Sequence, residues 1–140
     1  MKKPPSLPPR YRPAAKERFM NPIMTEYFRQ KLLRWKQELQ LESSETIQHL
    51  QAESLHEADL ADRATLETDR SLVLRTRDRE RKLISKIDAA LRRIEDGSYG
   101  FCEETLEPIS LQRLEARPIA TLSIEAQERH ERLERTHRDE

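Results

Sequence analysis

Four positions toward the C-terminal end of the chain have the spacing of a metal site. Cys102 and Thr105 are three positions apart, and after seventeen further residues Ser123 and Ala126 are again three apart. Two C-x2-C pairs at about this separation form a four-cysteine zinc site, in which thiolates surround the ion as a tetrahedron. Only one cysteine remains here; threonine and serine are poor zinc ligands, and alanine has no ligating atom. We therefore predict the fold of a zinc finger without the ion.

A finger without zinc must be stabilised by packing, since a structural zinc ion contributes about 10 kcal/mol or more to folding. We expect Ser123 to cap the last helix and Cys102 to be a small, partly buried side chain, with a redox-sensitive thiol as the alternative. The apolar side chains predicted to replace the ion are Phe101, Leu106, Ile109, Leu111, Leu114, Ile119, Leu122 and Ile124.

A second group of chemically capable residues is acidic. Asp59 and Asp62 lie in the segment 53–69, which has six acids and one base, whereas the next segment, 70–86, has seven bases and two acids. Two aspartates three positions apart at a helix start can cap the helix and complement its dipole. The same carboxylates are also available to a partner.

Long helices must position both groups. The Asn21-Pro22 pair is typical of a helix start, and apolar residues spaced by three and four predict a helix over 22–53. A second helix is expected from near Asp59 to Asp96, where Gly97 can end it. The two predict an antiparallel coiled-coil hairpin over 22–97, with its tip near 54–64.

The remaining segments flank the hairpin. Residues 1–21 form a basic, proline-rich arm that we expect to be extended or loosely packed. Residues 98–140 are expected to form the small zinc-finger-like lobe and a C-terminal helix that frays into the charged tail. The fold class is therefore mostly α.

Composition limits the function classes. Charged residues make up 37% of the chain and aromatic residues 5%, which predicts elongated helices with a narrow apolar seam. No run of residues is apolar enough for a membrane span or a secretory signal, so we expect a cytoplasmic monomer without a membrane partner. No set of nucleophile, base and orienting group recurs, which argues against an enzyme.

Four short stretches together resemble one known family, namely 59–64 (DLADRA), 77–87 (RDRERKLISKI), 96–104 (DGSYGFCEE) and 113–118 (RLEARP). The sequence is similar to the DksA/TraR family of bacterial RNA polymerase-binding regulators. The resemblance implies a coiled coil that enters the secondary channel of RNA polymerase and brings its tip near the active centre. It also implies regulation of initiation at promoters such as those of stable RNA, without promoter-DNA binding and often together with the alarmone ppGpp.

The resemblance assigns roles at the tip. The family's two tip aspartates fall on Asp59 and Asp62, and its tip alanine falls on Ala64. We expect Asp59 to act largely as a cap and Asp62 to face the polymerase. Leu60 occupies a position where the family usually has proline, so the tip geometry is expected to differ slightly.

The resemblance also assigns polymerase or ppGpp contacts to Arg75, Arg79, Lys86 and Arg117. The alternative for the first three is a solvated helix face. Gln127 replaces a lysine that often completes the alarmone site, which predicts weaker ppGpp dependence. Zinc is expected to be absent.

Two other functions stay open. A Gre-like cleavage factor has a similar coiled-coil plan, but the tip sequence resembles the DksA form. A helical adapter or nucleic-acid binder would use the arginine-rich stalk, but the isoelectric point of about 6.9 and the few aromatic residues argue against it.

Overall fold

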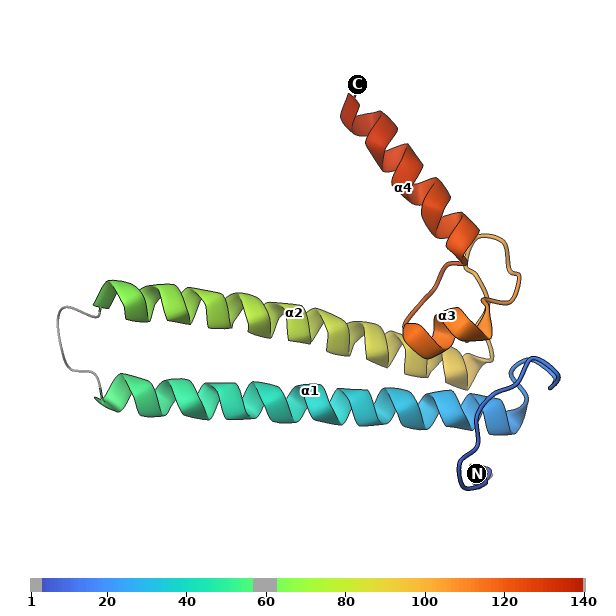
Figure 1. Cartoon of the computed structure of the whole chain (residues 1–140), viewed down its shortest axis with the longest axis horizontal. Coiled ribbons are helices and arrows are strands. Elements are labelled where there is room, and N and C mark those ends of the chain that lie inside the picture. The colour runs from blue at the N-terminus through green and yellow to red at the C-terminus, as the bar shows by residue number, and fades with distance from the viewer. Residues whose placement is uncertain (1–3, 57–62, 140) are drawn as a thin grey trace. The chain divides into compact units, whose positions relative to one another are not determined.

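The computed structural model describes residues 4–56 and 63–139, and Asp59 and Asp62 lie outside this part of the chain. Its helices are α1 (Pro22–His56), α2 (Arg63–Asp96), α3 (Leu111–Ala116) and α4 (Ile124–Asp139), shown in Figure 1. The chain divides into two compact units. One is Leu33–Asp88, and the other combines Met1–Leu32 with Ala89–Glu140. The mostly helical fold class is confirmed, and each unit is described separately.

The ends of α1 and α2 follow from local sequence signals. Asn21 caps α1, because its side-chain oxygen accepts a hydrogen bond of 2.9 Å from the Met24 N–H. Gly97 ends α2 with a φ of 85°, a left-handed conformation that glycine adopts without strain. The start of α1 and the end of α2 agree with the prediction. Helix α1 extends three residues beyond the expected end, to His56.

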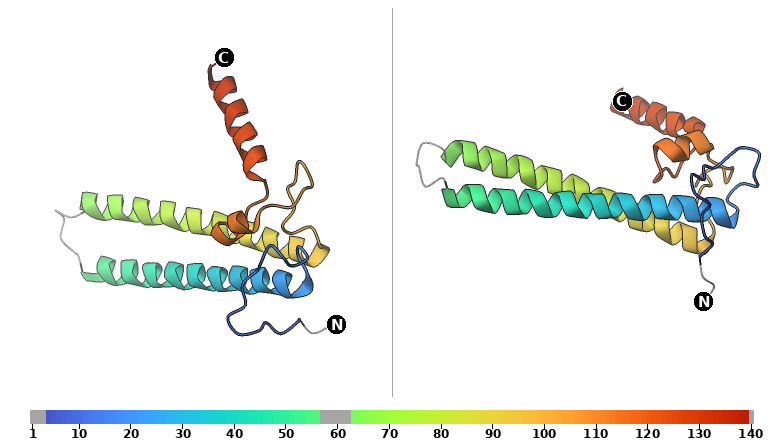
Figure 2. Two further views of the ribbon diagram at one scale, coloured as in Figure 1. Left: turned by 45° about the vertical axis from the view of Figure 1, so that its right-hand side comes forward. Right: turned by 60° about the horizontal axis from the view of Figure 1, so that its bottom comes forward.

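The unit Leu33–Asp88 consists of two antiparallel helical segments that run side by side in all the views of Figures 1 and 2. Leu39 and Ile87 are buried in the seam between them. An ion pair of 2.7 Å joins Lys36 on α1 to Asp88 on α2. This unit is a narrow coiled coil rather than a thick core.

The middle of this seam is polar. Val73, Glu80 and Ile87 are seven residues apart and therefore lie on the same face of α2. Glu80 is half-buried, and its Oε2 atom is fully covered without a hydrogen-bond partner in the described part of the chain. A covered oxygen without a partner is destabilising. The run 75–82, which has no apolar side chain, thus turns partly into the seam and partly toward solvent.

Replacing Glu80 with leucine is expected to stabilise the hairpin. Glu80→Leu removes the covered oxygen and completes an apolar heptad, which should raise the free energy of unfolding by about 1–2 kcal/mol. Urea denaturation followed by circular dichroism measures the change. The control is Asp78→Leu, since Asp78 is exposed on the same helix. An equal gain in both variants would show that general helix propensity, not the seam, is responsible.

The other unit contains the larger core. Its buried side chains come from the first turns of α1, the last turns of α2, and the segment 99–126: Met24, Phe28, Leu32, Ala90, Tyr99, Cys102, Ile109, Leu114, Ile119, Ala120 and Ala126. The rings of Phe28 and Tyr99 are 5.7 Å apart. Burial raises the pKa of Tyr99, whose hydroxyl donates a hydrogen bond of 2.8 Å to the Pro118 carbonyl. The finger is thus packed directly against α1.

The N-terminal arm contacts the rest of its unit through a few side chains, and none of residues 4–20 is buried. Tyr11 contacts Tyr27 at a ring distance of 5.9 Å, and Phe19 contacts Phe101 at 5.3 Å. Gly100 has a φ of 90°, and a Cβ there would be 2.9 Å from the Met20 side chain. The arm lacks regular secondary structure, but its aromatic and sulfur-containing side chains cover the finger.

Two residues expected in the finger core are exposed. Leu106 is 75% exposed in a turn with a φ of 61°, and Ile124 is 49% exposed at the first position of α4. Cys102 is fully rather than partly buried. Helix α4 continues to Asp139 instead of fraying after its first turns.

Among residues 4–56 and 63–139, no helix combines the length and apolarity needed to cross a bilayer.

Candidate functional site

One of the four positions with metal-site spacing holds a buried thiol, that of Cys102. Cys102 is fully buried, and its sulfur accepts hydrogen bonds from the Thr105 hydroxyl and from the backbone of Ser123, Thr105 and Glu104. Burial acts to raise the pKa of this thiol, but the hydrogen bonds outweigh burial and lower the pKa to about 6.

The side chains at these positions do not fit a zinc ion. Ser123 caps α4, because its hydroxyl accepts a hydrogen bond of 3.2 Å from the Ala126 N–H. Ala126 is fully buried, so a methyl group occupies the position of the fourth ligand. Within residues 4–56 and 63–139, no group of three histidine, cysteine or acidic side chains is arranged to hold a metal. Ile109, Leu114 and Ile119 are buried in the same unit as these positions.

A row of exposed cations lies on α2. Arg75, Arg79 and Lys86 are all exposed, and their spacings of four and seven residues place them on one face of the helix. Lys82 is exposed on the same face, because it follows Arg79 by three residues. Lys82 was not among the predicted contact residues, although its helical spacing from Arg79 can be read from the sequence. We call these four residues the cationic row.

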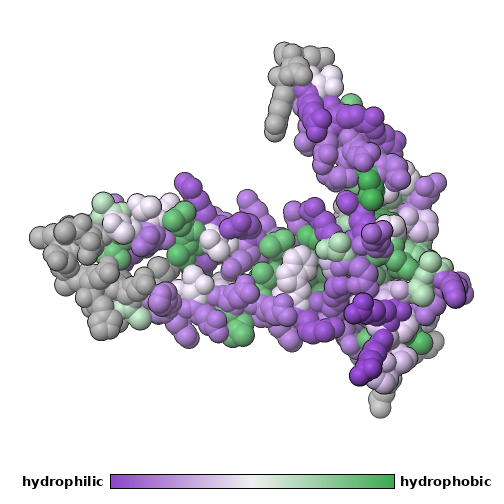
Figure 3. All heavy atoms as spheres, in the orientation of Figure 1, coloured by the Kyte–Doolittle hydropathy of each residue, from purple (hydrophilic) through white to green (hydrophobic). Residues whose placement is uncertain are grey.

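The cationic row continues into a shallow depression toward the start of α2. Ala64 and Arg75, both predicted contact residues, line this depression together with Glu67, Thr68, Ser71 and Leu72. Its volume is about 440 Å³, and Leu72 is 54% exposed beside it. Hydrophilic side chains cover most of the visible face of the long helices in Figure 3. The depression therefore offers a small apolar contact next to a cation.

Arg117, in the other unit, is exposed at the end of α3. Its guanidinium has no hydrogen bond or ion pair within the described ranges of the chain. Arg113, in the same RLEARP segment, instead donates a hydrogen bond of 2.9 Å from Nε to the Leu122 carbonyl. Of these two arginines, Arg113 has a structural partner and Arg117 is available to a ligand.

Gln127 is half-buried near the start of α4. Its backbone N–H donates to the Ser123 carbonyl at 2.9 Å, and its side chain donates to Glu131 at 3.3 Å. An amide at this position can donate hydrogen bonds but adds no positive charge for a phosphate ligand.

Comparison with known proteins places these features in a family. Residues 24–94 match the profile of the DnaK suppressor protein DksA, N-terminal domain. Residues 97–132 match the profile of the prokaryotic dksA/traR C4-type zinc finger, although this chain has a cysteine at only one of the four positions.

Individual relatives agree with the profiles. The chain is 70% identical to the RNA polymerase-binding transcription factor DksA of Caulobacter vibrioides, over 93% of this chain and 92% of the relative. It is 44% identical to the protein of the same name from Escherichia coli K12, over 78% and 72% of the two chains. The structure of transcription factor DksA2 from Pseudomonas aeruginosa matches with a TM-score of 0.78 and 46% identity, covering 84% of this chain and 90% of that one. The chain therefore belongs to the DksA family.

Proposed function

We propose that this protein regulates transcription by binding RNA polymerase. The observation that carries the proposal is the 70% identity to an RNA polymerase-binding transcription factor over nearly the full length of both chains. The exposed cationic row on α2 supports it, because a row of cations on a long helix suits an acidic protein surface. Membership in a family of transcription factors also favours a binding protein over an enzyme.

In the proposed binding mode, the hairpin is the part of the protein that inserts into the polymerase. The hairpin enters the secondary channel of the polymerase, where Asp62 acts near the active centre, Asp59 caps the start of the second helix, and Ala64 contacts the channel. Arg75, Arg79 and Lys86 bind the channel rim or ppGpp. The length of the two-helix unit and the exposure of these three cations support this mode.

We further propose that ppGpp acts with the protein through Arg117, whose unpartnered guanidinium suits phosphate oxygens. Gln127 in place of lysine is expected to weaken this response. The protein works as a cytoplasmic monomer without zinc and without direct binding to promoter DNA. The poor fit of Cys102, Thr105, Ser123 and Ala126 to a metal supports the zinc-free state.

Asp62→Asn is expected to abolish most of the regulation. The substitution removes one charge from the tip, and inhibition of a stable-RNA promoter should fall at least about fivefold, as expected when a contact of about 1 kcal/mol is lost. In vitro transcription with and without ppGpp measures the effect, with polymerase affinity determined in parallel. Asp69→Asn, seven residues further along, is the matched control. If inhibition by Asp62→Asn is unchanged while polymerase binding is intact, the assignment of Asp62 to the tip contact is wrong. A separate assay with backtracked complexes tests the alternative function, because shortening of the RNA would favour a Gre-like cleavage factor.

A further inference from the structure

The backbone around Arg117 is fixed on both sides. The Arg117 N–H donates to the Arg113 carbonyl at 2.7 Å, and the Arg117 carbonyl accepts from the Ala120 N–H at 3.0 Å. The next residue, Pro118, is buried, and its carbonyl accepts the hydrogen bond from Tyr99. The Arg117 backbone is thus held in place while its guanidinium is exposed. Because the backbone is already ordered, the conformational entropy lost when Arg117 binds an anion is limited to that of its side chain.

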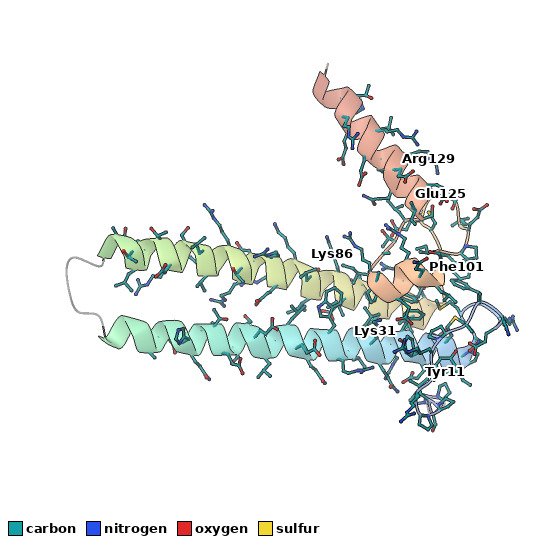
Figure 4. The ribbon with its side chains drawn as sticks, in the orientation of Figure 1. Tyr11, Lys31, Lys86, Phe101, Glu125 and Arg129 are labelled. Atoms are coloured by element: carbon teal, nitrogen blue, oxygen red, sulfur yellow. The ribbon has the colours of Figure 1, made fainter. Side chains whose placement is uncertain are left out.

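Side chains of α1 hold the end of α3, the helix that precedes Arg117. The Lys31 Nζ atom is 2.7 Å from Glu115 Oε2 and 2.9 Å from the Glu115 backbone carbonyl. The Tyr27 hydroxyl donates to the same carboxylate oxygen at 3.0 Å. Figure 4 labels Lys31 on α1, where these contacts join it to the last turn of α3. Lys31 therefore fixes the helix turn immediately before Arg117 and binds a carbonyl that the helix leaves without a partner.

Lys31 also controls charge near Arg117. Glu115 is two residues before Arg117, and an unpaired carboxylate at this distance along the chain would oppose the binding of an anion. The ammonium group of Lys31 neutralises that carboxylate. The geometric and the electrostatic effect act in the same direction, since both favour an anionic ligand at Arg117.

We propose that Lys31, assisted by Tyr27, is a positioning residue that holds and electrostatically prepares Arg117 for a phosphate-bearing ligand. This inference rests on the proposed role of Arg117 in the ppGpp response. Lys31 need not contact the ligand itself, because it acts on Arg117 through Glu115 and the end of α3.

The chain provides a matched control for this proposal. Lys36, also on α1, forms an ion pair of the same length, 2.7 Å, with Asp88. The side chains of that pair are 29% and 37% exposed, and those of Lys31 and Glu115 are 32% and 35% exposed. Lys36→Met therefore removes an ion pair between helices of equal length and similar exposure that does not involve α3. Any effect of losing such a pair in general should appear in both variants.

The test is in vitro transcription with purified polymerase and increasing ppGpp, using the full chain as wild type, Lys31→Met, Lys31→Arg, Lys36→Met and Arg117→Ala. The readout is the ppGpp concentration for half-maximal effect, together with the inhibition by each variant without ppGpp, which corrects for any loss of folded protein. We expect Lys31→Met to need about threefold to tenfold more ppGpp, since a partial loss of preorganisation and charge balance corresponds to a change of this size. Lys36→Met should match the wild type, Lys31→Arg should largely restore the response, and Arg117→Ala should lose it.

The outcomes separate the inference from the function on which it rests. If Arg117→Ala loses the ppGpp response while Lys31→Met behaves like Lys36→Met, the positioning role of Lys31 is wrong and the role of Arg117 stands. If Arg117→Ala retains the full response, or the wild type has none, the proposed role of Arg117 is wrong and the inference falls with it.

Discussion

Restoring three cysteines is expected to turn the finger into a zinc site. In the variant Thr105→Cys/Ser123→Cys/Ala126→Cys, the new thiols join Cys102 at the spacing of a four-cysteine site. Thr105 and the Ser123 backbone already contact the Cys102 sulfur, so the two halves of the site are close together. Zinc binding to such sites contributes about 10–16 kcal/mol of apparent free energy at neutral pH, far more than the three substitutions are expected to cost.

Elemental analysis and thermal unfolding with and without a chelator measure this gain. The variant is expected to bind one zinc ion per chain and to lose stability in the chelator. The wild type is expected to bind no stoichiometric zinc and to be unaffected. Adding Cys102→Ser to the variant supplies the control, because it leaves three thiols and should weaken zinc binding strongly. Stoichiometric zinc in the wild type would overturn the zinc-free proposal.

Truncating Phe28 is expected to cause the largest loss of stability. Phe28 is 0% exposed, and its ring lies 5.2 Å from that of Tyr27 and 5.7 Å from that of Tyr99. Phe28→Ala removes a fully buried ring where α1 and the finger meet, which costs about 3–5 kcal/mol. Since small proteins have about 5–15 kcal/mol of stability in total, much of this unit should unfold.

Urea denaturation followed by circular dichroism checks this prediction. The control is Leu41→Ala on the same helix, because Leu41 is 62% exposed and should change the free energy of unfolding by less than about 0.5 kcal/mol. A loss below about 1 kcal/mol for Phe28→Ala would contradict the importance of this cluster, since even modest cavities in a core cost more.

The long helices were predictable because their signals are local. Asn21 and Gly97 determine helix ends through the conformation and hydrogen bonds of their own backbone. The seam residues Leu39 and Ile87 belong to series of apolar residues spaced by three and four, which can be read from the sequence alone. The row Arg75, Arg79 and Lys86 was likewise predictable as one face, because any helix places residues at these spacings together.

The finger and the arm were harder to predict because their contacts are distant in sequence. Leu106 was expected in the core on its apolar character, but the turn at this position directs it toward solvent. Arg117 was found by resemblance, whereas its supports Lys31 and Tyr27 are more than 80 residues away from Glu115. No periodic pattern connects residues at that separation. The tip aspartates lie outside the described residues, so their roles stay predictions.

The contacts between α1 and the finger set the order in which the chain can fold during synthesis. Tyr27 and Lys31 bind a residue made 88 and 84 positions later, and Phe28 packs against Tyr99. A metal-held finger can fold as soon as its own ligands have been made. In this chain the finger also contacts the first helix, and that helix completes its packing only when the ribosome has delivered the last third of the protein.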